Sequence, residues 1–166
     1  MAKKLASLRD LYVHELRDLF SAESQILKAL PKLIKAASDP QLRQAFEEHL
    51  QVTERQVERL ERLFEKLDEK PKGRKCIAME GLIEEAKEIL GEDAEPDVRD
   101  AALIASAQKV EHYEIAGYGT VRTFARQLGD PEAVDLLQAT LDEEGDADKR
   151  LTAIAEGRIN AEAAVP

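Results

Sequence analysis

Hydrophobic residues recur along most of the chain at intervals of three and four, which is the period of a helix with one buried face. In the first segment this pattern extends from Leu8 to Ile34, and three later segments repeat it. The pattern predicts four long helices over residues 7–37, 40–69, 98–128 and 131–156, and a short helix over residues 77–90. Residues 161–166 follow the last helix and are expected to form a frayed tail.

The same turn signal occurs twice, as Asp39-Pro40 and as Asp130-Pro131. Aspartate caps a helix N-terminus, and proline suits the first helical position. When the second half of the chain is moved back by 91 residues, these turns coincide and Glu114 falls on Glu23. The repeat predicts two helix hairpins joined by a long crossover that carries the short helix. That order is typical of a four-helix bundle.

Composition supports an all-α fold. The chain has 166 residues, 4% aromatic residues, 8 glycines and 6 prolines. Good helix formers dominate the rest. The length fits a single domain over residues 1–166.

Charge and cysteine content limit the partners and the location. With 24 basic and 34 acidic residues, the net charge is −10, which argues against nucleic acid and anionic membranes as partners. No apolar run approaches the roughly 18 residues of a membrane span, and no signal-peptide pattern follows Met1. The single cysteine, Cys76, precludes an intrachain disulfide and fits a reducing compartment, so we expect a cytoplasmic protein.

Carboxylates on the inward helix faces are the functional signal, because a charge at a core position needs a partner or a metal ion. When the two helices of each hairpin are reflected about their turn, these acids and one amide fall at a similar height in the bundle. The set is Glu23, Gln56, Glu111, Glu114, Glu144 and Asp148.

Five acids in one dry place repel one another unless some are protonated or a cation lies among them. Hard cations with oxygen ligands are the simplest explanation, and two iron or manganese ions bridged by glutamates need about this number of acids. The alternatives are a solvent-filled bundle centre and acids paired with Arg or Lys. No Arg or Lys occupies the inward positions at this height, which weakens the second alternative.

Two further residues are second candidates for the site. His49 lies on the core face of the 40–69 helix but seven residues, or about 10 Å, from Gln56. A hydrogen-bonded core histidine is therefore favoured over a ligand. Glu54 flanks the same face, and a solvated side chain is at least as consistent with its position. We expect His112 on the surface and Cys76 to be a small buried thiol.

Several segments resemble the YciF/YciE family of bacterial ferritin-like stress-response proteins, in order from about residue 7 to residue 156. The most specific is Gln108-Lys-Val-Glu-His-Tyr-Glu114. The others are Phe20-Ser-Ala-Glu23-Ser-Gln25, Ala29-Leu-Pro-Lys32, Phe46-Glu-Glu-His49, Ala78-Met-Glu-Gly-Leu82 and Leu141-Asp-Glu-Glu144 with Asp148.

The resemblance implies a rubrerythrin-like four-helix bundle, a homodimer, a carboxylate-bridged di-metal site and a role in stress response. The wider ferritin-like pattern has Glu, Glu-x-x-His, Glu and Glu-x-x-His on its four helices. Glu23, Glu114 and Glu144 match three of the glutamates. Thr53-x-x-Gln56 replaces one Glu-x-x-His pair, and Ala147 occupies the place of the other histidine. Both usual histidine ligands are therefore missing.

Two functional hypotheses follow. In the first, Glu114 and Glu144 bridge two Fe or Mn ions, and Glu23, Glu111 and Asp148 are terminal ligands. Gln56 is then a weak ligand or a donor to one. The chemistry would be binding or oxidation of Fe(II), with oxygen or peroxide, and whether it amounts to a ferroxidase or peroxidase-like activity stays open. In the second hypothesis, the bundle is a metal-free dimer with a structural or interaction role.

Overall fold

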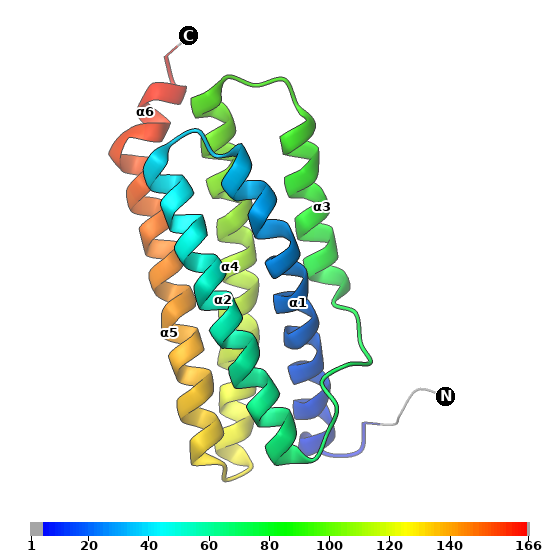
Figure 1. Ribbon diagram of the computed structural model, residues 1–166. Coiled ribbons are helices and arrows are strands. Elements are labelled where there is room, and N and C mark those ends of the chain that lie inside the picture. The colour runs from blue at the N-terminus through cyan, green and yellow to red at the C-terminus, as the bar shows by residue number, and fades with distance from the viewer. Residues whose placement is uncertain (1–4, 166) are drawn as a thin grey trace.

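The computed structural model describes residues 5–165 and is a helical bundle. Its main helices are α1 (Leu8–Ala36), α2 (Pro40–Leu67), α3 (Ile77–Gly91), α4 (Pro96–Gln127) and α5 (Pro131–Ile154). The hairpin of α1 and α2 packs beside the hairpin of α4 and α5, and α3 lies against α1 and α4 (Figure 1). The prediction of two hairpins with a helical crossover is confirmed. Within the described part of the chain, no helix is both long and apolar enough to cross a membrane.

Local capping explains where the helices begin. The Ser7 side chain accepts a hydrogen bond from the backbone amide of Asp10 at the start of α1. The carboxylates of Asp39 and Asp130 do the same for α2 and α5, and each is followed by a proline in the first turn. The repeated Asp-Pro turn therefore has the role that the sequence predicts, and it fixes the register of each hairpin.

The C-terminal segment differs in part from the prediction of a frayed tail over residues 161–166. The helix continues from α5 through a π-helical turn, Ala155–Ile159, into α6 (Asn160–Ala163). Residues 164 and 165 are not helical, as expected, and residue 166 lies outside the described residues. Ile159 is fully buried in the core, and Arg158 donates to the Asp39 carboxylate at 2.6 Å, so the π-helical turn is held against the bundle.

The core consists of two apolar clusters. One lies toward the α1–α2 turn and includes Ile26, Leu30, Leu42, Phe46, Leu103 and Ile159. The other lies toward the α4–α5 turn and includes Tyr12, Leu16, Leu60, Leu63, Val121 and Leu137. Buried polar side chains come between these sequence positions on α1, α2, α4 and α5. The fold therefore surrounds a polar centre with apolar packing at both ends.

Candidate metal centre

Each of the four bundle helices contributes a polar side chain to the centre. Glu23 comes from α1, Gln56 from α2, Glu111 and Glu114 from α4, and Glu144 from α5. All five residues are at most 3% exposed. They occupy positions where the neighbouring turns of each helix present apolar residues, so the helical period that buries the core also buries these groups.

Four residues come especially close together. His49, Glu111, Glu114 and Glu144 each offer one ligand atom, and these atoms all lie within 4.8 Å of one another. Two oxygens on opposite sides of an ion with bonds of about 2.1 Å lie about 4.2 Å apart. The spacing of this group is therefore close to the dimensions of a metal site.

Several buried oxygens in the centre have no hydrogen-bond partner among residues 5–165. Buried polar atoms are normally satisfied, since an unpaired one costs free energy. Carboxylate and amide oxygens are also the ligands that hard cations prefer, so the donor set fits iron or manganese. The unpaired atoms are both carboxylate oxygens of Glu114, Oε2 of Glu23, Glu111 and Glu144, and Oε1 of Gln56.

The remaining oxygens are held by neutral donors. The Gln56 amide donates to Oε1 of Glu144, and the Tyr118 hydroxyl donates to Oε1 of Glu23.

A neighbouring acid outside the central group is paired with a cation. Arg59 donates to both carboxylate oxygens of Glu143, at 2.6 and 2.8 Å. This cation neutralises an acid beside the centre. No Arg or Lys in the described chain lies within 4.0 Å of the central carboxylates.

Burial and mutual repulsion change the protonation of the central acids. Burial, reinforced by the charge of Glu144, raises the pKa of Glu23 to about 8. Burial and neighbouring carboxylates also raise the pKa values of Glu111 and Glu114 well above the ordinary value. Burial lowers the pKa of His49, which favours the neutral imidazole that binds metal ions. Without a cation, the centre retains protons at neutral pH.

His49 lies closer to the central acids than its distance from Gln56 along the helix suggested. Its Nε2 lies 3.4 Å from Oε1 of Glu111. Both α2 and α4 run toward the same end of the bundle (Figure 1). His49 precedes Gln56 and Glu111 precedes Glu114, so both residues are displaced toward the α1–α2 turn. The parallel direction of these two helices was the signal that would have placed them together.

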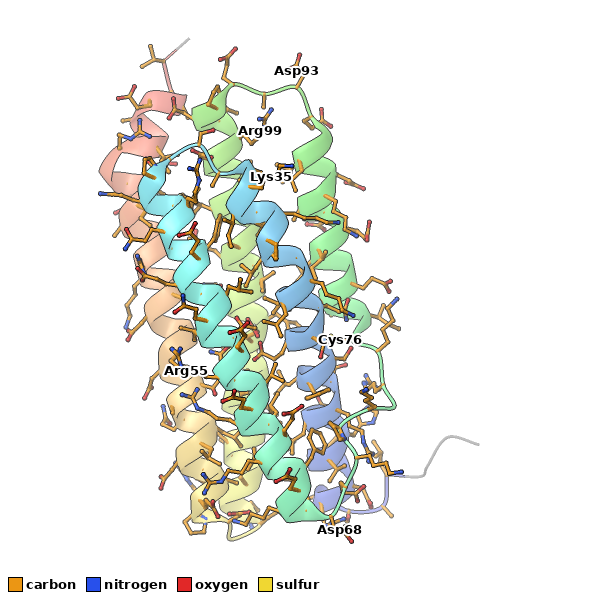
Figure 2. The ribbon with its side chains drawn as sticks, in the orientation of Figure 1. Lys35, Arg55, Asp68, Cys76, Asp93 and Arg99 are labelled. Carbon is orange, nitrogen blue, oxygen red and sulfur yellow. The ribbon has the colours of Figure 1, made fainter. Side chains whose placement is uncertain are left out.

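Three of the predicted acids, Glu23, Asp148 and Glu54, are not part of the close group of four residues. The Asp148 carboxylate accepts a hydrogen bond from Gln108 at 3.0 Å and lies 3.3 Å from His112 Nε2. Its side chain is 22% exposed. Glu54 is exposed on α2, next to Arg55, which is labelled in Figure 2. His112 is on the surface and Cys76 is buried, as expected.

Two cavities reach this centre from different sides. A cavity of about 450 Å³ is lined by α1, α3 and α4, and one of about 230 Å³ lies between α2 and α5. Phe46, His49 and Glu111 line both. The smaller cavity is also lined by charged side chains, and these are paired: Glu48 with Arg150, Glu143 with Arg59 and Asp146 with Lys149. The centre is therefore approached by a small opening lined by ion pairs and by a larger cavity with an apolar inner wall.

Known proteins are similar to this chain in sequence and in fold. Protein YciF of Escherichia coli strain K12 is 49% identical over 96% of both chains. The crystal structure of this protein, described as a stress protein, matches with a TM-score of 0.90 over 94% of the chain and 99% of its own. A Rhodopseudomonas palustris protein named YcfI, for which a structural role is suggested, is 46% identical. It matches with a TM-score of 0.88 over 92% of the chain and 97% of its own.

A more distant match defines the fold class. A two-domain protein from Anabaena variabilis, with DJ-1/ThiJ/PfpI-like and ferritin-like domains, matches 97% of the chain at 20% identity and a TM-score of 0.65. The chain spans 40% of that protein. The fold is ferritin-like, as the sequence indicated. Residues 7–164 match a family described as a domain of unknown function, DUF892. The chain therefore belongs to the DUF892 family, together with the stress protein YciF.

Proposed function

We propose that this chain is a ferritin-like metal-binding protein of the stress response, which holds two Fe or Mn ions among its central carboxylates. The observation that carries the proposal is the group of buried oxygens on Glu23, Gln56, Glu111, Glu114 and Glu144 that lack partners in the described chain. Such a group is expensive in an apolar core unless a cation compensates it. The similarity to the stress protein YciF supports the cellular role.

The geometry suggests a role for each residue. Glu114, with two free oxygens, and Glu144 are the proposed bridging ligands, while Glu23 and Glu111 are terminal ligands. His49 supplies a neutral nitrogen beside Glu111. Gln56 orients Glu144 through its amide hydrogen bond. We leave Asp148 and Glu54 outside this set because of their positions.

Bound iron would supply redox chemistry, namely oxidation of Fe(II) by oxygen or peroxide. The protein's own contribution is to orient the carboxylates and to exclude bulk water from them.

Elemental analysis tests the proposal directly. The protein would be purified without chelators from cells supplied with iron and manganese. We expect about two metal ions per wild-type chain and close to none in a Glu114→Gln, Glu144→Gln variant, which preserves side-chain volume. The control is Glu54→Gln, Glu58→Gln, which removes the same charge from the exposed face of α2 and retains the metal. Equal metal content in the wild type and the central variant would contradict the proposal.

A metal-free structural role is the competing function. Neutral donors already satisfy one oxygen each of Glu23 and Glu144, and a structural role is suggested for the relative from R. palustris. This function predicts negligible metal in all three proteins. In both functions we propose a homodimer. Sedimentation velocity should then give twice the chain mass of 18.5 kDa.

A further inference from the structure

The larger cavity has the form of a small-molecule site that extends from the surface into the bundle. Its volume of about 450 Å³ falls within the usual range for such sites, about 300–1,000 Å³. It reaches Phe46 and Ala107, which are 2% and 7% exposed, so its inner wall belongs to the core. Apolar side chains of α1 and α3 form another part of the wall: Ile26, Leu30, Leu33, Leu82, Ile83 and Leu90.

The charges at its rim differ from those of the rest of the molecule. Lys28 and Lys32 lie one helical turn apart on α1, are exposed, and form no ion pair within residues 5–165. Two other lysines of the cavity lining are each paired with a glutamate of α3, Lys75 with Glu80 and Lys87 with Glu84. In a chain with a net charge of −10, two free cations beside an apolar cavity form a local site for an anion.

A polar group also lines the inner wall of the cavity. Ser106 of α4 belongs to this lining and is 4% exposed. A serine hydroxyl can donate and accept a hydrogen bond. The inner wall therefore offers one polar group to an occupant, in addition to apolar surface.

We propose that this cavity binds a single-chain amphipathic carboxylate of fatty-acid type. Its carboxylate lies beside Lys28 and Lys32, and its alkyl chain lies between α1, α3 and α4. The apolar walls bury the chain, and the free lysines complement the head group. A neutral molecule would leave the lysines unused, and a compact anion would leave the apolar walls uncovered. The inner end of this cavity adjoins His49 and Glu111 of the proposed metal centre, whereas Glu114 and Glu144 lie outside its lining. The proposal goes beyond the proposed function.

A fluorescence titration tests the site. Dansyl-labelled undecanoic acid is added to metal-depleted protein and then displaced by dodecanoate or by dodecanol. We expect saturable binding, with dodecanoate displacing the probe at lower concentration than dodecanol. The Glu114→Gln, Glu144→Gln variant should bind the probe as well as the wild type does. Failure of metal binding and failure of this site are therefore distinguishable.

Two variants assign the site to this cavity. Lys28→Glu, Lys32→Glu should weaken the binding of dodecanoate by about tenfold and leave that of dodecanol unchanged. Its control is Lys70→Glu, Lys72→Glu, which makes the same charge change on exposed residues outside the cavity and should bind normally. Ala29→Trp should block both ligands, because Ala29 forms part of the wall. Circular dichroism would verify that each variant is folded.

Three results would overturn the proposal. The first is no saturable binding of the probe to the wild type. The second is equal displacement by dodecanoate and dodecanol, or no effect of Lys28→Glu, Lys32→Glu. The third is the absence of binding together with a change from dimer to monomer in Ala29→Trp. That outcome would assign this face to contact between two copies of the chain.

Discussion

Two groups of buried acids in this bundle have opposite surroundings. At the α1–α2 turn, Asp100 accepts hydrogen bonds from the backbone amides of Ser38 and Asp39, at 2.9 and 2.7 Å. Asp39 in turn accepts from Leu42 at 2.9 Å and from Arg158 at 2.6 Å. At the bundle centre, by contrast, Glu114 accepts from no group of the described chain. Burial alone therefore does not define the role of an acid.

The pKa of Asp39 and that of Glu23 shift in opposite directions, because only Asp39 accepts hydrogen bonds from a cation and from backbone amides. Burial opposes the ionisation of Asp39, but the hydrogen bonds from Arg158 and from the first turn of α2 lower its pKa below the ordinary value. In the centre, burial and like charges act in the same direction, and the pKa of Glu23 rises to about 8. The turn uses its acids to hold the backbone. The centre keeps its acids available for a cation, which is why we assign function to one region and structure to the other.

The largest expected effect that would test this comparison is the pH dependence of stability in metal-depleted protein. An unfolded glutamate releases its proton near pH 4.3, whereas folded Glu23 keeps it until about pH 8. Between these values the folded state binds more protons, so the free energy of unfolding falls as pH rises. The expected loss is about 1.4 kcal/mol per pH unit for each such acid. Urea denaturation at pH 5 to 8 with a chelator measures it.

A Glu23→Gln variant is the control for this dependence, because its amide does not titrate. The slope should become smaller in the variant. Asp39, at the turn, gives the opposite sign. The lowered pKa of Asp39 contributes stability above pH 4 that is lost on further acidification. A free energy of unfolding that rises from pH 5 to pH 8 would show that the central acids are ionised and compensated without metal.

The next effect concerns the turn itself. Asp100→Ala leaves two amide groups, those of Ser38 and Asp39, without their acceptor. We expect the free energy of unfolding to fall by about 3 kcal/mol, since each unpaired buried donor costs about 1–3 kcal/mol. Asp135→Ala, at an exposed position of α5, should change it by less than about 0.5 kcal/mol. Equal stability of both variants would remove the structural role assigned to the turn.

Hydrophobic spacing predicted the fold because each long helix buries one continuous face. The two Asp-Pro turns fixed the hairpins, and reflection about them placed Glu114 at the height of Glu144. The same argument could not separate Glu144 from Asp148, which lies one turn away and is held by Gln108. It also could not place Arg59, whose flexible side chain reaches Glu143 on another helix.

Other features depend on contacts between distant segments. The π-helical turn at Ala155–Ile159 is stabilised by burial of Ile159 and by the pair between Arg158 and Asp39, which are 119 residues apart. The local pattern instead predicted that the last helix ends at residue 156. The larger cavity arises where α3 meets α1 and α4, and the sequence fixes neither the packing of α3 nor the pairing of the rim lysines.

The smallest of these effects is the change in stability when two central glutamates become leucine, and the response of this variant to added metal distinguishes the two functions. In metal-depleted protein, Glu114→Leu, Glu144→Leu should raise the free energy of unfolding by about 2 kcal/mol, because apolar groups replace buried acids that lack partners. Both functions predict this gain, whereas a clear loss of stability would mean that the acids support the fold.

Addition of Fe(II) or Mn(II) then distinguishes the metal-binding function from the structural one. If the centre binds metal, thermal denaturation shows that the ions stabilise the wild type and leave the leucine variant unchanged, since only a bound ligand shifts the folding equilibrium. If the protein has a structural role instead, added metal stabilises neither the wild type nor the leucine variant. The unpaired oxygens of Glu114 would then be a cost of the fold that no ion offsets.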